Sequence, residues 1–129
     1  MKWGCAPDGD QTSRLAYEAY LLLFFGAIDG ELDAAEKSTI RSLLDERAAS
    51  LGGVVDVALQ EAAAYFDSLC DNASRADSLA MVCRILGEVL SRAELLELHE
   101  HCVDVACVDG HIHDREVKLL EVVKETWRV

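Results

Sequence analysis

The sequence has little proline and no long apolar run. Only Pro7 is a proline among the 129 residues, so nothing beyond the first few residues interrupts a helix. The longest apolar stretch covers residues 20–28, far short of the roughly 20 residues that cross a bilayer. No strand-like alternation of useful length occurs. These absences argue against membrane insertion and against a sheet, and favour a compact helical domain.

Basic residues are also scarce. Twelve Lys and Arg stand against 24 Asp and Glu, which gives a net charge of -12, and no basic stretch occurs. Such a field repels nucleic acid and anionic lipid, and favours cations or a protein partner with a basic surface. We therefore expect no nucleic-acid ligand. The charge does not distinguish a monomer from a homodimer.

An even set of cysteines and the common catalytic motifs are missing as well. The five cysteines are an odd number, and because only two residues precede Trp3, we expect no apolar signal segment. A reducing, cytoplasmic location fits this pattern better than a disulfide framework. The chain has no Gly-rich phosphate loop, GxSxG or HExxH, so we expect no enzymatic activity.

What the sequence does have is helical periodicity from Thr12 onwards. Residues 1–11 show no period and are interpreted as a disordered N-terminal tail, which leaves residues 12–129 as a single domain. The first periodic segment is apolar nearly all round and should form the axis of the core. Apolar residues recur at helical spacing over six segments, expected at residues 13–28, 34–51, 54–70, 75–90, 92–108 and 114–127.

The same periodicity predicts which side chains face the core. In the last segment Val117, Leu120, Val123 and Trp127 are expected inward, whereas Arg47 lies off the apolar stripe of the second segment. The acidic residues of the fifth segment are interpreted as a solvated face, with a docking face for a basic partner as the alternative. They are Glu94, Glu97 and Glu100.

One motif occurs twice. FGAIDGELDAAE, at residues 25–36, returns as VACVDGHIHDRE at residues 105–116. Each copy joins two helices through Asp-Gly and places a Glu six residues after the Gly. A helix hairpin accounts for much of this pattern, because the Gly suits a helix C-terminus, Asp33 can cap the next helix and Glu36 can complete a capping box.

The aspartate of each Asp-Gly pair is harder to explain. Asp29 and Asp109 fall at a helix C-terminus, where the helix dipole disfavours a negative charge by up to about 1 kcal/mol. Two explanations stay open: hydrogen bonds from the first amides of the next helix, or a bound cation. The spacing also imitates the second half of an EF-hand loop, but Phe25 and Ala27 stand where that loop needs oxygen ligands, so an EF-hand is excluded.

With two such copies in a helical chain, residues 13–127 resemble the TerB-like domain of tellurite-resistance and related stress proteins. The resemblance implies an all-α fold of two pseudo-repeated helix hairpins. It also implies a module at work in the cytoplasm or at the inner membrane face, whose acidic loop residues hold a divalent metal. We therefore expect a non-catalytic cytoplasmic module of the tellurite or chemical stress response. The alternative is a protein-interaction scaffold whose loops are purely structural.

The resemblance further implies which residues hold the metal. In the second loop His111 and His113 stand where the first loop has Glu31 and Asp33, with Asp114 alongside. Oxygen-rich sites suit calcium, magnesium or manganese, whereas imidazole and carboxylate together favour zinc, nickel or copper. The expected cofactor is therefore a divalent cation: calcium, magnesium, manganese or zinc. The predicted ligands are Asp29, Glu31, Asp33, Glu36, Asp109, His111, His113 and Glu116.

Histidines and cysteines also crowd into residues 99–113. A single zinc site is not expected from them, because a rise of 1.5 Å per residue places His99 roughly 15 Å from the loop that carries His111. We interpret the helical members of this group as core thiols and solvated histidines. They are His99, His101, Cys102 and Cys107.

Overall fold

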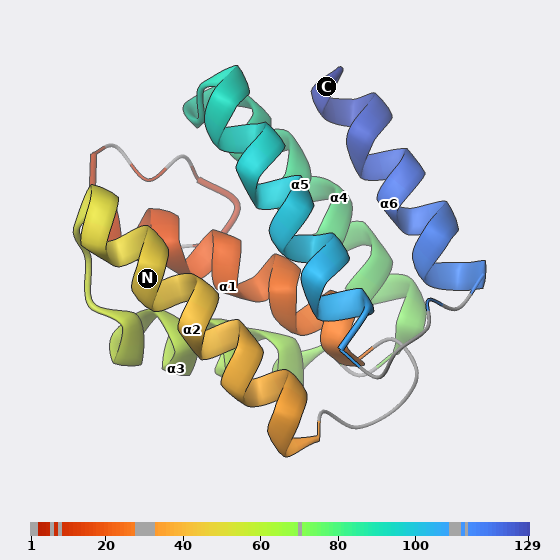
Figure 1. Ribbon diagram of the computed structural model, residues 1–129, viewed down its shortest axis with the longest axis horizontal. Helices are drawn as coiled ribbons and strands as arrows, with labels where there is room; N and C mark the ends of the chain where they lie inside the picture. Colours follow the sequence, from red (N-terminus) through yellow and green to blue (C-terminus); the bar gives the residue numbers. More distant parts are fainter. Residues whose placement is uncertain are drawn as a thin grey trace.

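The computed structural model of the chain describes residues 3–5, 7, 9–27, 33–69, 71–108, 112 and 114–129. Those residues form six helices and no strand (Figure 1). The predicted all-α fold class is therefore confirmed, and each helix begins and ends within three residues of its expected bounds. The helices are α1 (Gln11–Ala27), α2 (Ala34–Leu51), α3 (Val55–Ser68), α4 (Asn72–Val89), α5 (Arg92–Ala106) and α6 (Asp114–Trp127).

Two helices begin earlier than the apolar pattern indicates, because an aspartate caps each of them. Oδ1 of Asp10 accepts hydrogen bonds from the backbone N–H of Thr12 at 3.0 Å and of Ser13 at 3.3 Å. Oδ1 of Asp71 accepts one from the N–H of Ser74 at 2.7 Å. Such caps satisfy the free amides of a first helical turn. In both helices the apolar stripe starts after the helix itself. A prediction based on the stripe therefore places the start of the helix too late.

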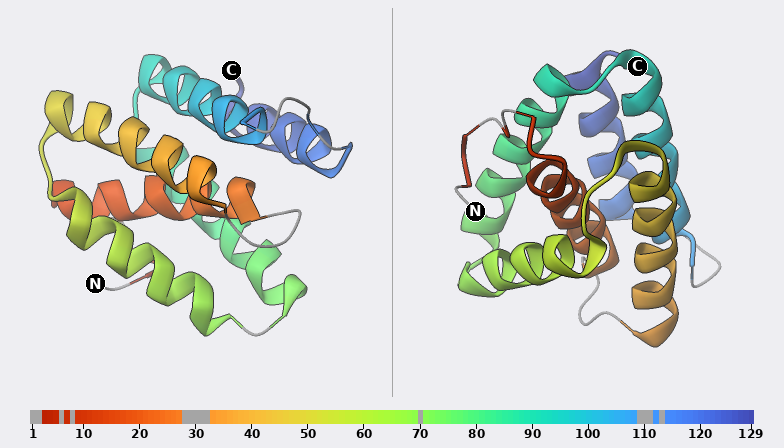
Figure 2. Two further views of the ribbon diagram at one scale, coloured as in Figure 1. Left: turned by 60° about the horizontal axis from the view of Figure 1, so that its bottom comes forward. Right: turned by 90° about the vertical axis from the view of Figure 1, so that its left-hand side faces the viewer.

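The core forms around α1, as its apolar sequence predicts. This helix contacts α2, α3, α4 and α5, while α6 packs against α4 and α5 (Figures 1 and 2). Tyr17, Tyr20, Leu21 and Leu22 of α1 are completely buried. None of the helices in the described ranges is both long enough and apolar enough to cross a membrane.

A pair of glycines turns the chain between α2 and α3. The backbone N–H of Gly52 donates to the carbonyl of Ala48 at 2.7 Å, which ends α2 as expected. Gly53 has a φ of 103°, and a Cβ there would lie 3.1 Å from the carbonyl oxygen of Gln11. Only glycine suits such a conformation and approach. The corner between α2 and α3 is thereby held against the start of α1.

α6 packs through a stripe that differs from the expected one by one residue. Trp127 is 6% exposed, and its indole Nε1 donates to the carbonyl of Cys83 at 2.8 Å. The prediction that it closes the core is confirmed. Val117, however, was wrongly assigned to the core, because it is 40% exposed while its neighbour Glu116 is 2% exposed. Adjacent helical residues diverge by about 100°, and the buried stripe passes through residue 116.

The segment before α1 contacts the domain. The ring of Trp3 stacks on Tyr65 with centroids 4.3 Å apart, and meets Tyr17 edge-on at 4.9 Å. The N–H of Gly4 donates to the hydroxyl of Tyr17 at 3.1 Å. These contacts hold Trp3 and Gly4 against α1 and α3, although the sequence suggests a disordered tail there. The division between residues 1–11 and the domain stays a prediction.

Candidate functional site

Three of the eight predicted metal ligands lie among the described residues. They are Asp33, Glu36 and Glu116. The others, which include the two aspartates of the Asp-Gly pairs, lie outside that part of the chain, so neither explanation of those aspartates is tested. The predicted ligands outside the described residues are Asp29, Glu31, Asp109, His111 and His113.

Asp33 and Glu36 form the capping box that the sequence predicts at the start of α2. Asp33 is the N-cap residue, and its Oδ1 accepts a hydrogen bond from the N–H of Glu36 at 2.7 Å. In return Oε1 of Glu36 accepts one from the N–H of Asp33 at 3.3 Å. Two amides of the first turn are thus satisfied. This part of the hairpin interpretation is confirmed.

The two copies of the motif differ at their shared glutamate. Glu116 is the third residue of α6, as Glu36 is of α2. Glu36 is partly exposed, whereas Glu116 is 2% exposed. Placing a carboxylate in the interior costs free energy unless it is paired or hydrogen-bonded. The second copy therefore holds its glutamate farther from solvent than the first.

The helices that precede the two motif copies meet at one side of the molecule. α1 and α5 are in contact, and both run towards the same side in Figure 1 and in the left view of Figure 2. Each helix C-terminus carries about half a negative charge. A cation at that side would be favoured by both helices. In the described part of the chain, no three His, Cys, Asp or Glu side chains are grouped as a metal site would require.

A buried ion pair between α1 and α2 was not anticipated from the sequence. Nε of Arg47 lies 2.7 Å from Oε1 of Glu18, and the side chains are 3% and 1% exposed. Placing Arg47 on the polar side of α2 was therefore wrong. The reason is that α5 also packs against α2, so residues off the apolar stripe are covered too.

Carboxylates of α5 extend this pair into a network. Nη2 of Arg47 lies 3.6 Å from Oε2 of Glu94, and its Nη1 lies 3.5 Å from Oε2 of Glu97. Glu94 also pairs with Arg14 of α1. The interpretation of these glutamates as a purely solvated face was wrong for Glu94, whose side chain is 24% exposed. Three helices, α1, α2 and α5, are thus joined by a network that runs from the buried pair to partly exposed charged groups.

Burial and charge act in opposite directions on the pKa of each member of the pair. Loss of water around the carboxyl group raises the pKa of Glu18, and the attraction of Arg47 only partly opposes the rise. For Arg47 burial lowers the pKa, but Glu18 and the α5 carboxylates outweigh it and leave it raised. One sequence signal could have revealed the pair. A glutamate inside a helix that is apolar nearly all round must be buried, and a buried carboxylate needs a cation.

The cysteines and histidines of α4 and α5 serve mainly in packing. Cys102 is a buried free thiol, as expected, whereas Cys107 is exposed, so its interpretation as a core thiol was wrong. Cys83 of α4 is also a buried free thiol, and burial raises its pKa to about 12. A thiol is a poor nucleophile when its pKa is that high. His101 is 6% exposed, so the interpretation of it as solvated was wrong. Its Nε2 lies 3.9 Å from Oε1 of Glu97.

Comparison with known proteins identifies the family. The family model described as Tellurite resistance protein TerB matches residues 16–129. That range holds both copies of the motif and nearly all of the six helices. No curated protein and no solved structure shows a significant match. Because the match covers nearly the whole chain, the protein belongs to the TerB family.

Proposed function

We propose that this protein is a non-catalytic, cytoplasmic TerB module of the response to tellurite or a related chemical stress, and that it binds a divalent cation at its two acidic loops. Membership of the TerB family across both motif copies carries the proposal. The net charge of -12 supports it, because such a field draws cations towards the surface. The ligands are the eight residues named from the family resemblance.

The capping box is compatible with this role. Each carboxylate of Asp33 and Glu36 accepts a backbone N–H through one oxygen. An ionised carboxylate has about four lone-pair sites, so the hydrogen bond that Asp33 accepts from Glu36 leaves sites on Asp33 for a cation. Capping and coordination therefore do not exclude each other at the start of α2.

The two loops should prefer different ions. Asp29, Glu31, Asp33 and Glu36 supply only oxygens in the first loop, which suits calcium, magnesium or manganese. The second loop combines two histidines with carboxylates, which favours zinc. A protein with both loops intact should therefore bind a hard ion and zinc at separate places.

Calorimetry and amide NMR with calcium, magnesium, manganese and zinc test the proposal on the full chain. We expect saturable heats and shifts confined to the helix ends beside each loop, lost in Asp29→Asn for the first loop and in Asp109→Asn for the second. Asp45→Asn is the matched control, because it makes the same charge change at an exposed position of α2. Absence of any shift at either loop at millimolar metal would refute the cation proposal and leave the hairpin.

A second variant separates capping from coordination. Asp33→Ser keeps an N-cap hydroxyl but removes the carboxylate, and serine caps about as well as aspartate. If Asp33 is a ligand, the variant should keep its stability and bind the first-loop cation less tightly. Unchanged affinity would remove Asp33 from the ligand set.

The second candidate function is an interaction scaffold, favoured by the same net charge. A basic partner would dock by electrostatic attraction, which salt screens. In a pulldown from cell lysate, a partner held in this way should be retained at low salt and lost at ~1 M salt, where the Debye length is about 3 Å. Retention at both concentrations would argue against charge as the basis of docking.

A further inference from the structure

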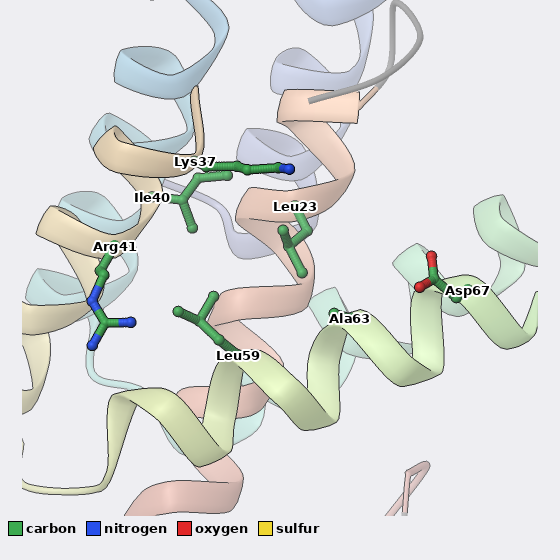
Figure 3. A pocket seen from close by; sticks show the side chains of 7 residues that line it. All are labelled: Leu23, Lys37, Ile40, Arg41, Leu59, Ala63 and Asp67. Atoms are coloured by element: carbon green, nitrogen blue, oxygen red, sulfur yellow. The ribbon is translucent and has the colours of Figure 1, made fainter. Parts of the chain in front are cut away.

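A groove opens between α2 and α3, with α1 as its floor. Its volume is about 490 Å³, which falls within the roughly 300–1,000 Å³ of small-molecule sites. Figure 3 shows Leu23 of α1, Ile40 of α2 and Leu59 of α3 around its centre. Three helices contribute to its walls, and the Gly52–Gly53 corner joins two of them. The groove is therefore part of the packed fold.

The charges around the groove are unevenly placed. Lys37 and Arg41 line its α2 side, and Asp67 lines it farther along α3 (Figure 3). Lys37 has no ion-pair partner among the described residues. Arg41 pairs with Asp56 at 2.7 Å, but the two side chains are 50% and 67% exposed, and such surface pairs contribute little. The α2 side thus offers Lys37 to a ligand as a cation, with the guanidinium of Arg41, which Asp56 also contacts, beside it.

These features point to one class of ligand. An apolar floor holds an apolar chain, the lysine and arginine attract an anionic head group, and Asp67 repels that head group from the α3 side. We propose that the groove binds a small amphiphilic monoanion, a medium-chain carboxylate. Its carboxylate lies at Lys37 and Arg41, and its chain lies over Leu23 and Leu59. The net charge of the protein does not prevent this, because salt screens distant charges beyond about 8 Å at 0.15 M.

Decanoate is the probe for the test, followed by amide NMR on the full chain below its micelle concentration. We expect saturable shifts at residues 23, 37–41 and 59–67. Octanoate should bind roughly tenfold more weakly, because it buries two methylene groups fewer. Decyltrimethylammonium has the same chain with a cationic head, so it should bind the groove at least about tenfold more weakly than decanoate.

Two variants with matched controls locate the head group and the chain. Lys37→Glu should weaken decanoate binding roughly fivefold or more. Lys118→Glu, the same change at an exposed position of α6, should not. Ala63→Leu places a larger side chain in the groove and should weaken binding about tenfold, whereas Ala80→Leu on the exposed face of α4 should not. Lys37 is exposed, so its variant should fold even if Ala63→Leu does not.

The proposal is overturned by any of three results. The first is the absence of saturable shifts in the groove, and the second is equal affinity for the anionic and cationic probes. The third is equal loss of affinity in Lys37→Glu and Lys118→Glu. The proposed cation binding at the loops is tested separately, with metal as the probe and Asp29→Asn and Asp109→Asn as the variants, so none of these three results decides it.

Discussion

At the scale of single residues, the pair of Glu18 and Arg47 is the feature of the interior that mutation should affect most. Both side chains are almost completely buried, and removing two charges from water costs several kcal/mol per ion. Their mutual attraction and the nearby carboxylates of α5 offset that cost. The pair therefore adds little net stability, yet each partner depends strongly on the other.

Arg47→Met should lower the free energy of unfolding by about 3–5 kcal/mol, because it leaves Glu18 in the interior without its cation. Urea denaturation measures the change. The double variant Glu18→Leu with Arg47→Met removes both charges, and should recover most of the loss. Glu18→Leu alone completes the cycle. If its loss of unfolding free energy and that of Arg47→Met add up to the loss in the double variant, the two side chains do not interact as the geometry indicates.

The raised pKa of Glu18 also predicts an unusual dependence on pH. Its native-state pKa lies above the 4.5 of an ordinary glutamate because burial disfavours the charge. The native state therefore binds the proton more tightly than the unfolded chain does. The contribution of Glu18 to stability is complete below pH 4.5 and is lost as the pH rises through the native pKa.

The variant Glu18→Gln isolates this contribution, because it cannot titrate. The free energy of unfolding of the unmodified chain, relative to Glu18→Gln, should fall as the pH rises above 4.5. Glu100→Gln changes an exposed glutamate of α5 and serves as the control. A relative stability that rises with pH would mean that the pKa of Glu18 is lowered.

At the scale of the helices, side-chain caps mark where α1, α2, α4 and α5 begin. Asp33 caps α2, and Ser91 caps α5 by accepting a hydrogen bond from the N–H of Glu94 at 3.2 Å. Both are short-range devices that depend on residues three apart. They can be predicted from the sequence for that reason.

Asp33→Ala should lower the free energy of unfolding by about 1 kcal/mol, because it removes the side-chain half of the capping box. Thermal or urea unfolding in the absence of metal measures it. Asp45→Ala, at an exposed position within α2, should cost less or even stabilise, because alanine is the better helix former. Equal losses in both variants would contradict the capping role.

The periodicity predicted the helices well and some of their faces poorly. Leu120, Val123 and Trp127 are buried as expected, because an apolar stripe needs a partner. Val117 and Arg47 were misplaced, since which flank of a helix is covered depends on its neighbours in space. A single sequence does not contain that information. The burial of Glu116 escaped prediction for the same reason.

At the scale of the whole molecule, the two motif copies have equivalent positions. Each copy follows one of two helices that contact each other, α1 or α5, and precedes a helix that runs back along the domain (Figure 1). The sequence predicted this repeated hairpin and the family resemblance, because both depend on a short local pattern. The arrangement of the predicted ligands could not be derived in the same way. It depends on how two segments eighty residues apart meet in space.

The central claim is that a divalent cation binds the native acidic loops. A ligand that binds only the folded state stabilises it, by about 2.7 kcal/mol when its concentration is a hundredfold above Kd. The direct measurement is the free energy of unfolding in urea, with and without manganese, for the unmodified chain and for Asp29→Asn combined with Asp109→Asn. We predict that manganese stabilises the unmodified chain and the control Asp45→Asn, but not the double variant. An unfolding free energy of the unmodified chain that is the same with and without the metal would contradict the claim.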